Sequence, residues 1–464
     1  MTDAPAEATS GATSDALPGR ALVGILLAAS LAPLGSTMIA VALPAIGADL
    51  RVPSAPLTQW LATSYLIVSL AFQTPGGKLG DRIGHRRNLG IGMVIYAVGG
   101  VLGFVVAKLP ALVVARVAMA AGSALMLPSA IAQIRLRTSA ERRGRAFGYF
   151  GAAMGIAAAL GPLLGGELVQ RFGWRALFIA PLPQLALAAV LVRSMSAENV
   201  ASGVTARGGF DLVGAALLAL GTGLVAAGLG SHGPESTVLV GVGVAALVAF
   251  TAWERRVKDP IVDMRLFRRP VFTAAGSVIA LTNLAMYALL FQLPIYFQRV
   301  HPGAAAELGR TLMVMMVAMV VCSPIGARVA DRIGPRATVT IGVLLALVAV
   351  SRFAALTSMQ VPRDAVLGLA LLGAGIGLVG APSQASAMNV VEPAEAGVAA
   401  GVFATLRYVG GVLGISILGF LLGADATEAD LSRHLLSIPF YAGALVLALV
   451  AALFLPGRAP RARA

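Results

Sequence analysis

Long apolar runs separated by short polar loops fill almost the whole chain. A helix of about twenty apolar residues spans the ~30 Å hydrocarbon core of a bilayer. The pattern therefore predicts an all-α membrane protein with fourteen transmembrane helices, and an even number puts both termini on one side. The predicted spans are residues 21–46, 56–76, 88–107, 110–134, 146–170, 174–192, 211–230, 236–253, 271–297, 308–327, 337–356, 364–389, 397–423 and 439–456.

Composition agrees with this pattern. Of the 464 residues, 58% are hydrophobic and 12% are charged, and the mean hydropathy is +0.86. A soluble domain has about 25% charged residues. No cleavage site follows the first apolar run, so we expect it to stay in the protein. Residues 1–20 form a polar leader that we expect to be disordered, and residues 457–464 form a basic tail.

The net charge of +14 comes from cations in short loops beside the apolar runs, a pattern that argues against a nucleic-acid partner. About two thirds of the 35 lysines and arginines fall in loops on the side of the termini. Because cytoplasmic loops carry the excess of Lys and Arg, we expect a multi-pass protein of the cell membrane with both termini in the cytoplasm. We expect it to act as a monomer in the lipid bilayer.

One motif occurs twice, as GGKLGDRIGHRR at 76–87 and as GARVADRIGPRA at 326–337. The first copy follows the second predicted span and the second copy follows the tenth, so equivalent loops are eight spans apart. Two six-helix halves with two helices inserted between them explain this spacing. The predicted halves are residues 21–192 and 271–456, with the inserted pair and its linkers at 193–270. Parallel repeats of this kind build transporters that expose a central site alternately to each side.

The chain resembles the major facilitator superfamily, and within it the fourteen-spanner drug:proton antiporters. The first loop matches the family's cytoplasmic signature at Gly77, Asp81, Arg82, Gly84, Arg86 and Arg87. The second loop matches at Asp331, Arg332, Gly334 and Arg336, while Ala327 replaces the first glycine. LVVARVAMAAG resembles the arginine signature of the fourth span. GAAMGIAAALGPLLGG resembles the antiporter signature of the fifth, at Gly151, Gly155, Gly161, Pro162 and Gly165.

This resemblance implies a secondary active transporter that exports small amphipathic compounds such as drugs or antibiotics in exchange for protons. A dedicated exporter of one self-made neutral or anionic metabolite is the alternative. We expect no enzymatic activity and no cofactor, since the chain has no clustered catalytic residues and no GxxxxGK[ST] nucleotide motif.

Both repeated loops are candidates for gating. Asp81 and the neighbouring arginines can form charge-assisted hydrogen bonds that hold one face shut and break when it opens. The alternative is that these charges only set the topology. The small residues of the fifth span permit close packing of a partner helix, and Pro162 can bend it. Ordinary helix packing is the alternative for that stretch.

Arg116 and Arg407 are the sharpest candidates for substrate contact or coupling, because a cation deep in a bilayer is costly and is generally kept for function. Hydrogen bonding to carbonyls of broken helices is the alternative. Neutral polar side chains in other predicted spans could join them or could simply link helices. These are Gln59, Thr63, Asn283, Tyr287, Gln292, Gln384 and Asn389. Together the set favours neutral or anionic compounds over dications.

The chain departs from the resembled family in its first span. The family has an aspartate in a phrase of the type LDxTIVNVALP, whereas this sequence reads LGSTMIAVALP with Gly35 in that place. The other acids fall in loops or near span ends, and the four histidines are expected in loops. Glu167 and Asp81 are the candidate proton carriers, with a structural role for each, such as a salt bridge of Glu167, as the alternative. The single cysteine, Cys322, predicts neither a disulfide nor a metal site.

Overall fold

The computed structural model describes residues 19–457 apart from 54–56, 107, 139, 194–210, 231–234, 258–259, 261, 263, 392–395 and 423–430. The predicted disordered leader, most of the linker before the inserted pair and nearly all of the basic tail lie outside the described residues. The leader's last two residues, Gly19 and Arg20, begin the first helix. The side chains of Gln59 and Asp81 also lie outside the description.

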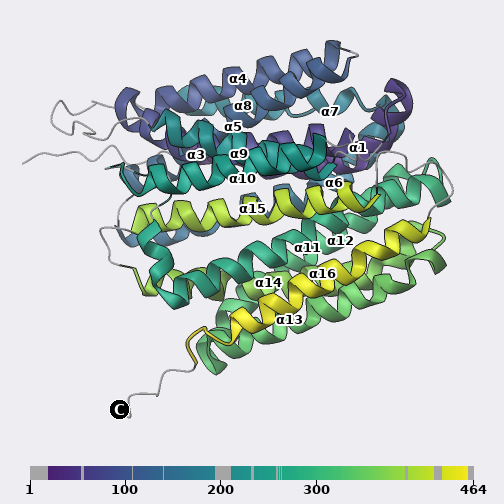
Figure 1. The fold of residues 1–464 in the computed structure, drawn as a ribbon. Helices are drawn as coiled ribbons and strands as arrows, with labels where there is room; N and C mark the ends of the chain where they lie inside the picture. Colours follow the sequence, from purple (N-terminus) through teal and green to yellow (C-terminus); the bar gives the residue numbers. More distant parts are fainter. Residues whose placement is uncertain are drawn as a thin grey trace, which may run out of the picture.

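Within the described residues the regular structure is helical (Figure 1). The elements of the first half are α1 (Gly19–Leu50), the π-helix η1 (Gln59–Thr63), α3 (Ser64–Ile83), α4 (His85–Val105), α5 (Leu109–Arg137), α6 (Ala140–Phe172), α7 (Ala176–Ile179) and α8 (Leu182–Arg193). The inserted pair is α9 (Leu212–Gly230) and α10 (Glu235–Glu254). The second half contains η2 (Met264–Arg268), α11 (Pro270–Val300), α12 (Ala305–Ile333), α13 (Pro335–Arg352), η3 (Phe353–Ser358), η4 (Pro362–Ala365), α14 (Val366–Asn389), α15 (Ala396–Leu422) and α16 (Leu431–Ala452).

Each half packs mainly within itself. In the first half α1 lies against α6, α8 and α5, and α5 also packs on α3 and α4. In the second half α11 lies against α15, α16 and α14, and α14 packs on α12 and α13. The Asn88 amide ties three helices of the first half together, because it donates to the carbonyls of Gly76 (2.8 Å) and Leu125 (3.3 Å) and to the hydroxyl of Ser129 (2.8 Å).

The two halves meet along two seams. On one side α6 packs against α12 over a long contact, and on the other α3 approaches α15. The inserted helices pack on each other, and α9 contacts both α3 and α15. The inserted pair therefore lies over the second seam, between the halves in Figure 1.

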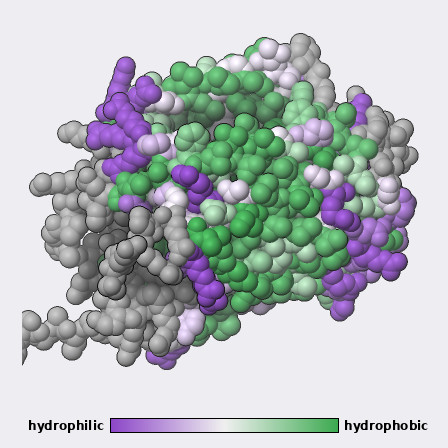
Figure 2. All heavy atoms as spheres, turned by 90° about the horizontal axis from the view of Figure 1, so that it is seen from below, coloured by the Kyte–Doolittle hydropathy of each residue, from purple (hydrophilic) through white to green (hydrophobic). Residues whose placement is uncertain are grey.

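Thirteen helices in the described part of the chain are long and apolar enough to cross a membrane. The exact number of fourteen is not confirmed, because the apolar part of the second predicted span covers only Trp60–Gln73. Its end is made polar by Gln73, Thr74 and Lys78. The surface fits a membrane protein: in Figure 2 a broad hydrophobic area lies between hydrophilic residues at its two ends.

A single glycine joins the two helices at each copy of the repeated loop. Gly84 separates α3 from α4 with φ = 91°, and Gly334 separates α12 from α13 with φ = 95°. Side chains make this backbone conformation unfavourable, so glycine is required for so short a connection. The repeated glycine therefore sets the angle between two membrane helices in each half.

We predict that Gly84→Ala or Gly334→Ala destabilises the protein by about 1–3 kcal/mol, because a Cβ is strained at these angles. The measurement is the thermal unfolding midpoint of the purified protein in detergent. Gly90→Ala is the matched control, since a Cβ at this position within α4 meets nothing within 4 Å. Equal midpoints for Gly84→Ala and Gly90→Ala would contradict the prediction.

Candidate functional site

The side of the molecule that holds the first turn of α1 and the end of α16 is called the terminal side here, and the other the opposite side. Both repeated loops lie on the terminal side. Arg86 donates to the carbonyl of Arg193 at the end of α8 (3.2 Å), and Arg336 donates to the carbonyl of Leu455 beyond α16 (2.8 Å). These bonds hold each loop to the last helix of its own half.

Arg116 is buried in the first half, about two turns into α5, with 2% of its surface exposed. Its Nε donates to the carbonyl of Leu61 and its Nη1 to the carbonyl of Gly35, both at 3.2 Å. Its guanidinium carbon lies 4.3 Å from the centre of the Tyr65 ring, a cation–π contact. Nη2 has no hydrogen-bond partner. The guanidinium borders a small cavity of about 10 Å³, the room needed for roughly one water molecule.

The room that an acid would occupy at position 35 is filled by a tyrosine. A Cβ on Gly35 would lie 2.9 Å from the hydroxyl of Tyr96 and 3.6 Å from that of Tyr65. Tyr65 bonds the carbonyl of Ala32 (3.1 Å) and the hydroxyl of Ser123 (3.0 Å), whereas the Tyr96 hydroxyl is buried without a hydrogen-bond partner. The missing carboxylate is thus replaced by aromatic rings and backbone carbonyls around Arg116.

Arg407 belongs to the second half and lies near the middle of α15, where its side chain is exposed. It lies near Tyr287 of α11 and near Tyr408, which follows it in the sequence. Tyr287 in turn lies near Ser36 of α1, in the other half, and stacks on Phe291. The two intramembrane arginines therefore belong to different halves and approach a shared group of tyrosines where the halves meet.

A contact between the halves lies next to this group. Gly411 lies one turn beyond Arg407 on the same face of α15 and packs against Leu66 of the first half and Tyr287. Arg407 itself is exposed. Gln384 and Asn389, near the terminal end of α14, are exposed as well. Three polar candidates of the second half, Arg407, Gln384 and Asn389, are thus exposed on the terminal side of the contact at Gly411.

The opposite side is closed along α6 and α12. Gly166 lies against the backbone of Ala305, and Gly309 lies against the carbonyl of Pro162, so that a Cβ on either glycine would collide with backbone. Gly155 approaches Val320 farther along the seam, but Gly151, toward the terminal side, is exposed with nothing near it. Gly161 and Gly165 face Thr37 and Met38 of α1. The small residues of the fifth span thus allow close packing both within the first half and between the halves.

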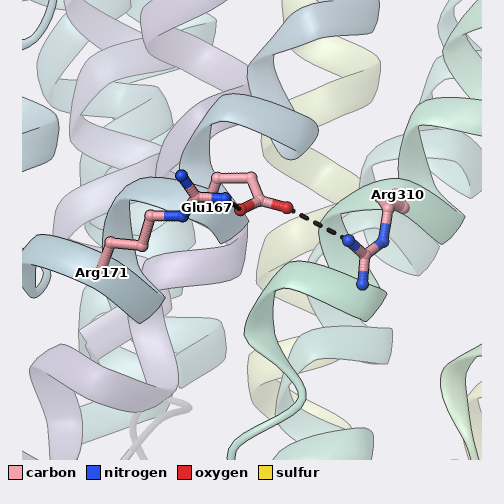
Figure 3. Close-up of polar contacts among 3 residues, drawn as sticks. All are labelled: Glu167, Arg171 and Arg310. Carbon is pink, nitrogen blue, oxygen red and sulfur yellow. Dashed lines mark hydrogen bonds and ion pairs between the residues drawn. The ribbon is translucent and has the colours of Figure 1, made fainter.

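An ion pair crosses the closed seam (Figure 3). Glu167 near the end of α6 lies 3.2 Å from Nη1 of Arg310 on α12, and 3.0 Å from Nη2 of Arg171 on its own helix. The Glu167 side chain is 28% exposed and that of Arg310 is 59% exposed. The pair joins the two halves on the opposite side, where sequence reasoning placed Glu167 but named no partner.

The remaining polar candidates do not form one site. Asn283 is buried and donates to the carbonyl of Ile279 in its own helix (2.9 Å). Gln292 is also buried, and it bonds the carbonyl of His434 (2.8 Å) and the hydroxyl of Ser437 (3.1 Å) on α16. Thr63 is buried in η1, and its hydroxyl has no hydrogen-bond partner. Gln292 therefore links two helices of the second half.

The expectation that every histidine lies in a loop is wrong. His434 lies in α16 with 1% of its surface exposed, and His85 begins α4 with 7% exposed. The sequence at the start of α16 predicts a loop because several polar residues surround His434, namely Ser432, Arg433 and Ser437. The backbone there is nevertheless helical. The tyrosines at 65, 96 and 408 were missed because single tyrosines in apolar runs carry no spacing signal.

Comparison with known proteins agrees with this architecture. The family model of the Major Facilitator Superfamily matches residues 25–415. The chain is 31% identical over 417 residues to the tetracenomycin C resistance and export protein of Streptomyces glaucescens, covering 88% of this chain and 76% of that protein. It is 32% identical over 428 residues to a puromycin resistance protein of Streptomyces alboniger, covering 89% and 83%.

The fold also matches solved structures. The xylose transporter XylE of E. coli, in a partially occluded inward-open conformation, superposes with a TM-score of 0.64 at 14% identity, over 94% of this chain and 98% of that one. The fold and site define a membrane transporter made of two helical halves. The chain belongs to the major facilitator superfamily, with relatives in antibiotic export and resistance.

We predict that Arg116→Ala lowers the stability of the purified protein by about 1–3 kcal/mol, because the carbonyls of Gly35 and Leu61 lose their buried donors. Thermal unfolding in detergent measures the change. Arg352→Ala, which removes an exposed arginine at the end of α13, is the control and should leave the midpoint unchanged. A midpoint equal to wild type for Arg116→Ala would mean that the two carbonyls are satisfied in another way.

Proposed function

We propose that this protein exports small amphipathic compounds from the cytoplasm by alternating access, with the terminal side facing the cytoplasm. The arrangement that carries the proposal is the sealed α6–α12 seam on the opposite side combined with the exposed side chains of Arg407, Gln384 and Asn389, which we propose line an opening to the terminal side. The relatives that act in antibiotic export and resistance support the substrate class. The excess of Lys and Arg on the terminal side supports the orientation.

The Glu167–Arg310 pair is proposed as the latch of the opposite side. Transport requires this seam to open, and opening separates α6 from α12 and with them the two charges. Both side chains are partly exposed, so the pair contributes at most about 1 kcal/mol. That strength suits a latch, because a much stronger bond would hold the transporter in one state.

The repeated loops are proposed as the matching gate of the terminal side. Asp331 and Arg332 are exposed, and the hydrogen bonds from Arg86 to Arg193 and from Arg336 to Leu455 stay within their own halves. A gate that closes the terminal side should be released in a conformation open to that side, and these contacts agree with that expectation. Asp81 is the proposed partner of the opposite half when the terminal side closes.

Proton exchange is the coupling that the family resemblance implies, and Glu167 would then be the carrier. In this conformation both of its oxygens face arginines, Oε1 toward Arg310 and Oε2 toward Arg171. The contacts therefore support the latch role of Glu167 better than the carrier role.

Export is tested by the accumulation of fluorescent amphipathic compounds in efflux-deficient cells. We expect cells that express the chain to retain several-fold less dye than cells with an empty vector. Asp81→Asn should restore full accumulation while the protein remains in the membrane, because a terminal gate without its charge cannot close. Equal accumulation with and without the wild-type chain, across the panel, would refute export.

The latch is tested by charge exchange. Glu167→Arg and Arg310→Glu should each change the transport rate up to about five-fold, and the double variant should recover most of the wild-type rate, as expected for a direct pair worth up to about 1 kcal/mol. Arg171→Gln is the matched control, since it removes an ion pair of Glu167 that stays within α6. Independent, additive effects of the two exchanges would show that the contact has no role in opening.

A further inference from the structure

We infer that the exported compounds are anionic amphiphiles and that the membrane potential, acting on their own charge, drives export without a proton carried on a protein carboxylate. The inference rests on the proposed export function and names its substrate class and energy source. Three observations carry it: the position of the acids, the position of the two arginines and the surroundings of those arginines.

The acids are confined to the ends of the helices. Every Asp and Glu in the described α-helices lies within about one and a half turns of a helix end, and Glu167 is the one farthest in. The room that an acid would need beside Arg116 is taken by the Tyr96 hydroxyl. Within the described part of the chain, the membrane interior therefore offers no carboxylate that could carry a proton or bind a cation.

The arginines, in contrast, lie deep in the helices and in both halves. Arg407 is near the middle of α15 and its side chain is exposed, at the inner end of the proposed terminal opening. Arg116 lies deeper, and its Nη2 has no hydrogen-bond partner. Two permanent positive charges without an intramembrane acid attract an anion and repel a cation, most strongly where water is scarce.

The surroundings of the arginines fit the rest of such a molecule. Tyr287 and Tyr408 lie within reach of the Arg407 charge, and Tyr287 stacks on Phe291. Aromatic rings bind an apolar body, while tyrosine hydroxyls and the guanidinium donate hydrogen bonds to a carboxylate, sulfonate or phenolate. An aromatic or lipophilic compound with one negative charge matches this site.

A negative charge on the substrate also provides an energy source for its export. The interior of the cell is negative, so an anion moves outward down the electrical gradient. For one elementary charge, 100 mV supports a concentration ratio of about 50-fold, which corresponds to about 2.3 kcal/mol. Alternating access by the two halves is then sufficient for export, and no titratable group on the protein is required.

The test uses the purified full-length chain in liposomes and three dyes that share one aromatic body and differ in one group: a carboxylate, its methyl ester and a primary amine. Potassium gradients with valinomycin set a membrane potential without a pH gradient. Equal potassium with valinomycin clamps the potential at zero while a pH gradient is applied. Protein-free liposomes measure passive leak.

With the potential alone, we expect the carboxylate dye to accumulate more than tenfold in the compartment made positive, and the ester and amine to follow passive leak. Arg407→Gln should slow carboxylate transport at least tenfold, and Arg407→Lys should retain most of it. Arg352→Gln, an exposed arginine at the end of α13, is the control and should transport at the wild-type rate.

Transport of the carboxylate under a pH gradient but not under a potential would overturn the inference, and so would preferential transport of the amine or the ester. Either result leaves the proposed export function intact. If none of the three dyes moves faster than leak through protein that unfolds at the normal temperature, the inference fails together with the export function.

Discussion

A bilayer core offers the backbone no hydrogen bonds, and this constraint determines most of the molecule. Each segment in hydrocarbon has to be a helix that satisfies its own amides, so the chain can only vary how its helices meet. Here they meet through glycines: α6 and α12 touch at backbone distance near Gly166 and Gly309. Such a contact places few bulky side chains between the two helices, so that little interlocking would resist the proposed separation of the halves.

The same constraint explains how much of the fold was predictable. Apolar length located the long helices, and the repeated DRIG motif indicated the two halves and the inserted pair, because both signals follow directly from membrane thickness and internal repetition. Helical segments that contain many polar residues were harder to predict. The second span begins as a π-helix and its apolar part is short, and the polar start of α16 conceals a buried histidine.

The candidate site was predictable only in part. Arg116 and Arg407 stood out because charge in an apolar run is rare, but the Tyr96 hydroxyl that fills the space at Gly35 could not be deduced, since it depends on how α1 and α4 pack. In the sequence Gln292 looked similar to the other polar candidates, yet it bonds α16 within its own half. A sequence shows which residues are polar or charged. It does not show which face of a helix contacts another helix, because that depends on packing between segments far apart in the chain.

The bonds of Arg86 and Arg336 have a mechanical consequence. Each fastens the hairpin after the second helix of a half to that half's last helix, so the ends of the half are tied together on the terminal side. A force applied to any one helix is then shared by its neighbours in that half. The two bonds therefore help each half to keep its shape as a unit on the terminal side, independently of which side chains face the other half.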